Sequence, residues 1–338
     1  MNVIGIESSC DETSVAVISN GILTSNLVAS QDFHVKYGGV VPELSSRAHL
    51  QIVMPLVKDA LVQSDIKFND IDVVCATAGP GLIGALLVGL TFAKGLAYSL
   101  NKPFVPVNHI EGHIFSGFLM KEKPEFPYLA VVVSGGHTLL LLVKSFTEIQ
   151  KLGSTVDDAA GEAFDKVAKM VGLGYPGGPK IQKSAESGNK EKISFPVADL
   201  DNPYNFSFSG LKTSVLRYIQ KNYPDKIIPD ADKNDIAASF QDAVIRALTR
   251  NAERALKHFE IKSLSLVGGV AANKPLGESL AKLAMKYNKK IIIPEMQYCG
   301  DNAAMITFRG MKLYESGIRY GLDYKPFPGI PENHFLDL

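Results

Sequence analysis

The sequence contains no tryptophan, only three cysteines and no excess charge of either sign. Cys10, Cys75 and Cys299 are widely separated and no C-x-x-C pair occurs, which argues against a disulfide framework or a thiolate zinc site. We therefore expect a reducing, cytoplasmic environment. Because Lys and Arg total 35, the same as Asp and Glu, the chain lacks the broad basic field of a free-standing nucleic-acid-binding protein. Any contact with RNA would need a local basic patch or a partner protein.

Neither the N-terminus nor the longest apolar stretch has the pattern of a membrane-targeting segment. Residues 1–10, MNVIGIESSC, have no basic region followed by an apolar core, so we do not expect a signal peptide. The stretch GLIGALLVGLTFAKGLAYSL, residues 81–100, contains four glycines and Lys94. This composition favours a buried helix over a membrane span. We expect no membrane association.

What the sequence does contain is one series of elements that occurs twice. The first series comprises predicted strands at 2–8, 13–19 and 22–30, a helix at 45–63, a strand at 71–78, a helix at 81–100 and a strand at 104–107. The second comprises predicted strands at 128–136 and 138–144, a helix at about 234–259, a strand at 263–269, a helix from about 273, a strand at 290–294 and a helix from about 302. Asn20-Gly21 is a typical hairpin turn between the second and third strands.

Two α/β lobes of the same topology, with a cleft between them, explain this repetition most economically. We place an N-terminal lobe at 1–125, completed by the C-terminal helix at about 300–325, and a C-terminal lobe at 126–299. An insertion at about 156–232, rich in Gly, Pro, Asn and Asp, interrupts the second series. Insertions of this kind are more often functional than passive.

Three glycine turns indicate what such lobes bind. They are SGGHT at 134–138, YPGGP at 175–179 and GGVAAN at 268–273. Backbone N–H groups in such turns and at helix starts bind phosphate oxygens. Backbone geometry explains any one turn alone. Three of them in a duplicated chain favour two ribonuclease-H-like lobes of the actin, heat-shock 70 and hexokinase (ASKHA) fold, with ESSCDET at 7–13 as the matching turn of the first lobe.

Two histidines in the stretch NHIEGH suggest a metal site. On a helix, His109 and His113 share a face and can bind one ion through their imidazoles. Glu111 lies about 180° from the midline between them, whereas the glutamate of the zinc-peptidase box H-E-x-x-H lies only about 80° from it. Glu111 therefore cannot serve as the general base of a zinc peptidase.

An isolated pair of histidines is more often without a ligand, unless a third residue joins it. Asp301, in GDNAAM at the mouth of the last predicted helix, is the candidate. Two imidazoles and one carboxylate leave coordination positions open, which suits a catalytic metal. Iron(II) and zinc both fit this ligand set.

Eight motifs occur in order along the chain: ESSCDET, NHIEGH, SGGHT, GEAFDK, PGGP, FSFSGLKT, GGVAAN and GDNAAM. Together they resemble the TsaD family, the tRNA N6-adenosine threonylcarbamoyltransferases once named O-sialoglycoprotein endopeptidases. The resemblance extends from about residue 3 to about residue 315. It implies transfer of a threonylcarbamoyl group from threonylcarbamoyl-AMP to the exocyclic amine of the adenosine 3′ of the anticodon, in tRNAs that read codons beginning with A.

The resemblance also implies roles for single residues. His109, His113 and Asp301 match the metal ligands, and the ion expected is one per chain, iron(II) ahead of zinc. Asp11 matches an acidic residue of the reaction centre, as a general base or only as an organiser of the site. The positions that match those holding the adenylate are Val132, Val133, Ser134, Gly135, Gly136, Asp165, Gly178 and Asn273.

Several of these positions have simpler explanations or depart from the family pattern. Taken alone, Asp165 would form a solvated ion pair with Lys166, and Asn273 would be a helix N-cap. Gln182 stands where relatives carry an acidic residue, so we assign it no cation-binding role. Val132 stands where archaeal and eukaryotic relatives carry a tyrosine, which places the chain in the bacterial branch.

The family implies two protein partners, a catalytically degenerate homologue (TsaB) and a small P-loop ATPase (TsaE). The predicted helix at 45–63 is a candidate docking surface for the homologue, although a core-packed helix has the same pattern. An ATPase or kinase of the same fold is the main alternative function. A non-catalytic scaffold is another, against which the intact His109, His113 and Asp301 argue.

Overall fold

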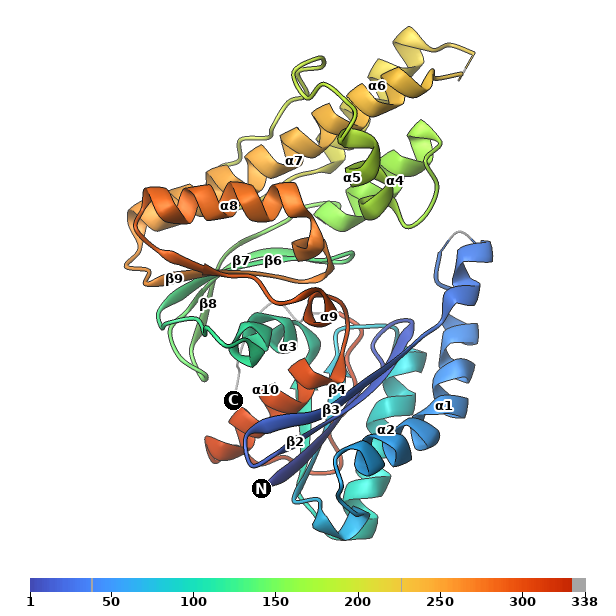
Figure 1. Cartoon of the computed structure of the whole chain (residues 1–338), viewed down its shortest axis with the longest axis vertical. Coiled ribbons are helices and arrows are strands. Elements are labelled where there is room, and N and C mark those ends of the chain that lie inside the picture. The colour runs from blue at the N-terminus through green and yellow to red at the C-terminus, as the bar shows by residue number, and fades with distance from the viewer. Residues whose placement is uncertain (38, 226, 330–338) are drawn as a thin grey trace. The chain divides into compact units, whose positions relative to one another are not determined.

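The computed structural model describes residues 1–37, 39–225 and 227–329, and Figure 1 shows the chain. Its contacts divide it into two compact units. Unit 1 contains Met1–Lys123, the short segment Phe146–Glu148 and the chain from Pro294 onward. Unit 2 contains Pro124–Ser145 and Ile149–Ile293. Each unit combines a five-stranded mixed sheet with helices, which is the α/β class that the repeated series predicts.

The sheet of unit 1 has the order β3-β2-β1-β4-β5. Its strands are β1 (Asn2–Glu7), β2 (Glu12–Ser19), β3 (Ile22–Ser30), β4 (Val73–Gly79) and β5 (Phe104–Asn108). β1, β2 and β3 pair antiparallel, whereas β1, β4 and β5 pair parallel. The predicted hairpin turn is present: Asn20 and Gly21 have φ of 52° and 81°, a left-handed conformation that these two residue types tolerate.

Side-chain alternation along β1 decides which helices cover each face of this sheet. The helices of unit 1 are α1 (Pro42–Gln63), α2 (Ile83–Leu100), α3 (His109–Phe115), α9 (Met296–Cys299) and α10 (Ala303–Glu315). Ile4 and Ile6 belong to the core that the sheet forms with α1 and α2. Gly5 faces the other way, where a Cβ would lie 2.1 Å from Thr307 Oγ1 of α10. The sheet is therefore sandwiched between α1 and α2 on one face and α10 on the other (Figure 1).

Unit 2 repeats this sheet strand for strand, in the order β8-β7-β6-β9-β10. The strands are β6 (Tyr128–Val133), β7 (Thr138–Val143), β8 (Ile149–Ser154), β9 (Ser263–Val267) and β10 (Lys290–Ile292). The pairing of β6 with β7 and of β7 with β8 is antiparallel, and that of β6 with β9 and of β9 with β10 is parallel. The sequence analysis missed β8, whose exposed Gln150 and Lys151 weaken the apolar signal of an edge strand.

The helices of unit 2 are α4 (Ala160–Val171), α5 (Gly177–Ala185), α6 (Ser209–Asn222), α7 (Asp230–His258) and α8 (Lys274–Lys286). The first three lie in the predicted insertion. α7 begins before the predicted start near residue 234, directly after Pro229. Asp230 and Asp232 in its first turn are favoured there because the helix dipole places positive charge at that end.

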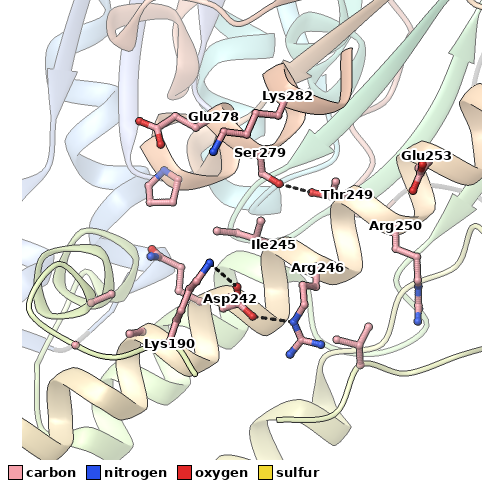
Figure 2. A pocket seen from close by; sticks show the side chains of 16 residues that line it. Lys190, Asp242, Ile245, Arg246, Thr249, Arg250, Glu253, Glu278, Ser279 and Lys282 are labelled. Carbon is pink, nitrogen blue, oxygen red and sulfur yellow. Dashed lines mark hydrogen bonds and ion pairs between the residues drawn. The ribbon is translucent and has the colours of Figure 1, made fainter. Parts of the chain in front are cut away.

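The described residues 194–203 of the insertion contain neither helix nor strand. Arginines of α7 hold this segment in place. Arg246, Arg250 and Arg254 are spaced one turn apart, and each donates a hydrogen bond to a backbone carbonyl within residues 195–203. Figure 2 shows Arg246 also bound to Asp242, at 2.7 Å, in a cavity of about 690 Å³ lined by α7, α8 and the insertion. Arg246 and Arg250, which both line this cavity, therefore also stabilise the insertion.

Helices α1 and α2 each bury one face and expose another. By length and composition alone, α2 would be able to cross a membrane, and a third of it is buried in the structure. The prediction of a buried helix at 81–100 is thus only partly right, since Leu87 is 47% exposed. Of the apolar positions predicted for 45–63, Leu50 and Met54 are 69% and 42% exposed. Together with Leu87 they line a groove of about 600 Å³, the α1–α2 groove.

Candidate metal centre

Helix α3 carries both histidines. It begins directly after β5, where the side chain of Asn108 caps it by accepting from the N–H groups of Ile110 and Glu111. Because His109 and His113 are one turn apart, their imidazoles project from the same face. Their ring centroids are 4.8 Å apart, and both side chains are buried.

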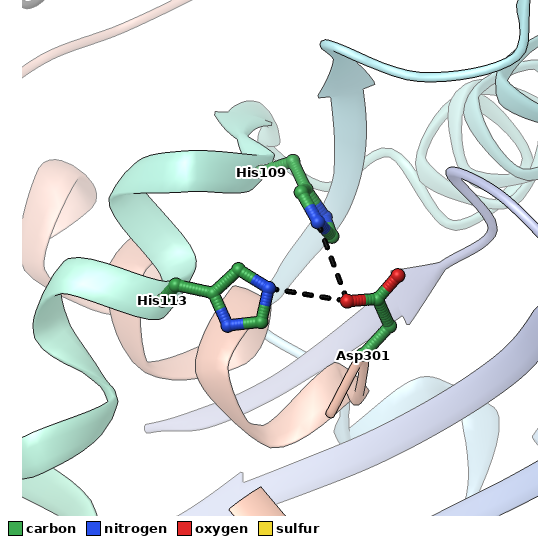
Figure 3. Close-up of side chains that lie close together, drawn as sticks. All are labelled: His109, His113 and Asp301. Atoms are coloured by element: carbon green, nitrogen blue, oxygen red, sulfur yellow. Dashed lines mark hydrogen bonds and ion pairs between the residues drawn. The ribbon is translucent and has the colours of Figure 1, made fainter. Parts of the chain in front are cut away.

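Asp301 completes the cluster from the residues that precede α10. Its Oδ1 lies 3.1 Å from His113 Nε2 and 3.4 Å from His109 Nε2 (Figure 3). One donor atom from each of the three residues lies within 4.8 Å of the others. The structure therefore brings together, within unit 1, the three residues predicted as ligands.

Glu7 orients His109 from the other side of its ring. Its Oε2 lies 3.0 Å from His109 Nδ1, and it also accepts hydrogen bonds from the Ser9 N–H and the Thr77 hydroxyl. Metal-binding histidines typically donate their second ring N–H to such a carboxylate. The sequence analysis missed this role of Glu7. The sequence contained a signal for this contact: Glu7 ends β1, and His109 directly follows β5. These strands run parallel, so both residues lie at the same edge of the sheet.

The cluster fits a divalent metal ion. Ligand atoms about 2.0–2.2 Å from a tetrahedral ion lie roughly 3.3–3.6 Å from one another. The two N···O distances of 3.1 and 3.4 Å are close to that separation. Glu7 occupies Nδ1 of His109, and the atoms that face one another are the two Nε2 atoms and the carboxylate of Asp301. This mixed donor set is one that iron(II) and zinc share.

Asp11 lies in the turn between β1 and β2, next to a second carboxyl group. Burial, and then the charges of Asp301 and Asp11, raise the pKa of Glu12 to about 9. The sequence analysis assigned a role to Asp11 and none to Glu12, although both belong to ESSCDET.

The predicted adenylate-binding positions lie in unit 2, where strand ends meet helix starts. Ser134, Gly135 and Gly136 form the turn between β6 and β7, in which the Ser134 N–H donates to the His137 carbonyl at 2.8 Å. A Cβ on Gly135 or Gly136 would meet nothing within 4 Å, whereas one on Gly161 of α4 would lie 2.5 Å from the Ser134 carbonyl oxygen. Helix α4 thus packs against the turn and leaves its tip open.

The two valines before this turn contribute differently from the glycines. Val132 and Val133 are fully buried strand residues, backbone included, whereas the glycine turn is open. Gly268, at the end of β9, lies against them: its φ is +94°, and a Cβ there would lie 2.5 Å from the Val133 carbonyl oxygen. The close approach of β9 and β6 therefore requires glycine at this position.

Asp165 and Asn273 hold the starts of two helices. Asp165 Oδ1 accepts from the Gly177 N–H at 2.6 Å, at the start of α5 beside Gly178, and burial raises the pKa of Asp165. The ion pair with Lys166 that the sequence alone suggests is wrong, because Lys166 binds Asp158 and Glu162 instead.

The Asn273 side chain caps α8 by accepting from the Leu276 N–H at 3.0 Å, as its residue type predicts. Its Nδ2 donates to Gln241 of α7 at 2.8 Å. Gln182 of α5 accepts from the Lys274 N–H at 3.3 Å. The departure from an acidic residue at Gln182 thus leaves a side chain that links the second half of α5 to the start of α8.

We expect the stability of the metal-free chain to depend on pH through the metal cluster. Burial alone would lower the pKa of His109, but the charges of Asp301 and Glu7 raise it well above 6.5. Burial would raise the pKa of Asp301, but His109 holds it well below 3.8. The His109 contribution to stability is therefore complete below about pH 6.5 and lost as pH rises through the raised pKa, whereas that of Asp301 is lost only in strong acid.

In excess chelator, the melting temperature should accordingly fall as pH rises above 6.5, relative to a His109→Gln variant that cannot titrate. Stabilisation by added zinc should grow over the same range, because metal binding needs neutral imidazoles. Equal pH slopes for the two proteins in chelator would contradict the assigned charge state of His109.

Solved structures share the fold of this chain. HypF of T. kodakarensis superimposes with a TM-score of 0.66 at 17% identity, covering 94% of this chain and 48% of that one. Component A of (R)-2-hydroxyglutaryl-CoA dehydratase from Acidaminococcus fermentans gives a TM-score of 0.54 at 16% identity, covering 94% and 98%. The chain thus spans about half the length of HypF, and its fold is of the ASKHA type.

Sequence comparison is more specific. The family model described as TsaD, tRNA N6-adenosine threonylcarbamoyltransferase, matches residues 22–308. The enzyme of that name from Thermosipho africanus is 52% identical over 332 residues, which cover 98% of this chain and 99% of the relative. That from Symbiobacterium thermophilum is 48% identical, covering 97% and 96%. With identity of this level along its whole length, the chain belongs to the TsaD family of tRNA N6-adenosine threonylcarbamoyltransferases.

Proposed function

We propose that this chain transfers the threonylcarbamoyl group of threonylcarbamoyl-AMP to the exocyclic amine of the adenosine 3′ of the anticodon, in tRNAs that read codons beginning with A. The observation that carries the proposal is the cluster of the buried His109 and His113 with the half-buried Asp301, in a chain of this family. The amine nitrogen forms a bond to the carbamoyl carbon, the bond from that carbon to the phosphate oxygen breaks, AMP leaves, and the amine loses a proton.

The reaction needs two kinds of help, because an adenine amine is a poor nucleophile. The departing phosphate gains charge, which oriented N–H groups and helix starts stabilise. The open turn at Gly135 and Gly136 and the start of α5 at Gly178 offer such groups. Asp165 has Oδ1 on Gly177, and we assign its other oxygen to a ribose hydroxyl. Asn273 maintains the start of α8 in this set.

The second requirement is polarisation of the donor. An ion held by His109, His113 and Asp301 would supply Lewis-acid chemistry there. Glu7 fixes the ring orientation of His109 through Nδ1. Asp11 is half-buried in the adjacent turn. We assign it one of two roles: it accepts the proton of the amine, or it only organises the site.

Reconstitution tests the proposal directly. The chain is incubated with TsaB- and TsaE-type partners, purified threonylcarbamoyl-AMP and unmodified tRNA, and the digested tRNA is analysed by mass for the threonylcarbamoylated nucleoside. We expect the modified nucleoside at the adenosine 3′ of the anticodon. Steady ATP hydrolysis by the isolated chain, without a modified nucleoside in the full mixture, would support the ATPase or kinase alternative instead.

We further propose that the α1–α2 groove binds the TsaB-type homologue and that the complex acts in the cytoplasm. The groove is apolar and exposed: Leu50, Met54 and Leu87 line it. Apolar patches of this kind are frequent at protein interfaces.

Leu87→Glu should weaken binding to the homologue by at least about thirty-fold, because it places a charge at an apolar contact. Val62→Glu is the matched control, since Val62 is 79% exposed on α1 and is absent from the groove lining. Calorimetric titration of both variants provides the measurement. Equal affinities for the two variants and the wild type would place the homologue elsewhere.

A further inference from the structure

Behind the metal cluster, α3 and α10 are joined by an enclosed ion pair. Arg309 and Glu111 are both buried, and Glu111 Oε2 lies 2.7 Å from Arg309 Nε and 2.6 Å from Nη2. Arg309 Nη1 also donates to the Phe146 carbonyl at 2.6 Å, and the guanidinium lies 4.5 Å from the centroid of the Phe115 ring. Glu111, the acidic residue of NHIEGH, therefore binds Arg309 of α10 and takes no part in the metal cluster.

Stability alone is a poor explanation for this pair. Burying two charges carries a desolvation penalty that their attraction often fails to exceed, so that apolar residues of similar volume are commonly as stable or more so. An ion pair differs from an apolar contact in its directionality: Arg309 Nε–H donates to Glu111 Oε2 and Nη1–H donates to the Phe146 carbonyl, which together orient the guanidinium against α3.

The pair joins the two elements that carry the candidate ligands. α3 supplies His109 and His113, and Asp301 lies just before α10. Glu111 lies between the histidines in sequence and on the opposite side of the helix. α3 is only seven residues long and all of them are buried, so its rotation about its own axis is set by tertiary contacts such as this ion pair. Such a rotation would turn both imidazoles away from the carboxylate of Asp301.

The glycine between Glu111 and His113 shows independently how close the two helices are. A Cβ on Gly112 would lie 2.8 Å from Ile306 Cδ1 and 3.2 Å from Met305 Cγ of α10. The backbone of α3 therefore lies directly against α10 at this point. The packing of Gly112 against α10 sets the distance between the two helices, whereas the ion pair restrains the rotation of α3 about its axis.

We propose that Glu111 and Arg309 are positioning residues of the metal centre, which set the rotation of α3 against α10 and thereby the approach of both imidazoles to Asp301. The proposal rests on the metal-binding role of the cluster in the proposed function. Neither residue contacts the cluster itself; they act through the helices that carry it.

Titration of the metal-free full chain with zinc(II), and separately with cobalt(II), tests this without measuring catalysis. Glu111→Gln keeps the shape of the side chain and removes its charge. Glu111→Met combined with Arg309→Met replaces the pair by apolar side chains and should retain the fold. We expect both variants to bind zinc about 10–100-fold more weakly, the range typical of losing groups that orient metal ligands, and to alter the visible spectrum of bound cobalt.

The matched control is Leu90→Ala, which leaves a cavity on the other side of the unit 1 sheet. It should lower the melting temperature while zinc affinity and the cobalt spectrum stay as in the wild type. A folded Met-Met variant with wild-type affinity and spectrum would overturn the proposal, because the pair would then serve stability alone. If that variant does not fold, Glu111→Gln decides by the same criterion. A wild-type chain that binds neither ion would contradict the metal role in the proposed function instead.

Discussion

Replacing both His109 and His113 by alanine is expected to reduce threonylcarbamoyl transfer by about a thousand-fold or more. Two of the three candidate ligand side chains are removed, so Asp301 alone cannot hold an ion in the cluster. Transfer is measured by mass analysis of nucleosides from tRNA in the reconstituted system. Elemental analysis of the purified variant should show loss of the ion found in the wild-type chain.

The control for this variant is His258→Ala, which removes a histidine of unit 2 that contacts Tyr204 and lies outside the cluster. It should keep the wild-type ion content and transfer rate. Circular dichroism of the double variant should show the wild-type secondary structure. Full transfer by a folded double variant would exclude a metal bound by these histidines from the reaction.

Gly268→Ala is expected to destabilise the chain by about 2–4 kcal/mol, through left-handed backbone strain and steric overlap together. The φ of +94° disfavours any side chain, and the added Cβ would lie 2.5 Å from the Val133 carbonyl oxygen. Relief of that overlap requires the end of β9 to move away from β6. Because the Ser134 turn follows Val133, we also expect weaker binding of the adenylate.

Gly269→Ala is the matched control one residue later. A Cβ on Gly269 would meet nothing within 4 Å, and the residue has no positive φ. Its effect on stability should stay within about 1 kcal/mol. Thermal and denaturant unfolding of both variants gives the comparison, and calorimetric titration with a non-hydrolysable adenylate analogue measures binding. Equal stability of the two variants would contradict the close packing of β9 against β6.

The repeated fold was predictable because each of its signals is local. Apolar runs of strand length and helical spacing identified nine of the ten strands found in the described residues and most helices of unit 1. The exception, β8, is an edge strand whose exposed polar residues hide its alternation. The duplication itself contained the missing information, since the first series has three consecutive strands before its first long helix.

The candidate metal centre was predictable only in part. His109 and His113 lie together because helix geometry relates residues four apart. Asp301 is separated from His113 by 188 residues, so its position at the mouth of the last predicted helix made it a candidate ligand and the family resemblance then supported it. Glu7, which binds His109 through Nδ1, and Arg309, which binds Glu111, carry no such motif-based role. Their partners are set by sheet order and by the packing of α10.

By itself, the sequence determined the duplicated α/β fold, the family and the shared face of His109 and His113 on α3, because periodicity and ordered motifs specify these without knowledge of long-range contacts. Only the tertiary structure decided which carboxylate orients His109, that Arg309 binds Glu111, and that Asp165 caps α5 in place of pairing with Lys166. The physical reason is that a buried charge takes whichever partner packing brings within hydrogen-bond reach, and for Glu7 and Glu111 that partner is about one hundred or more residues away.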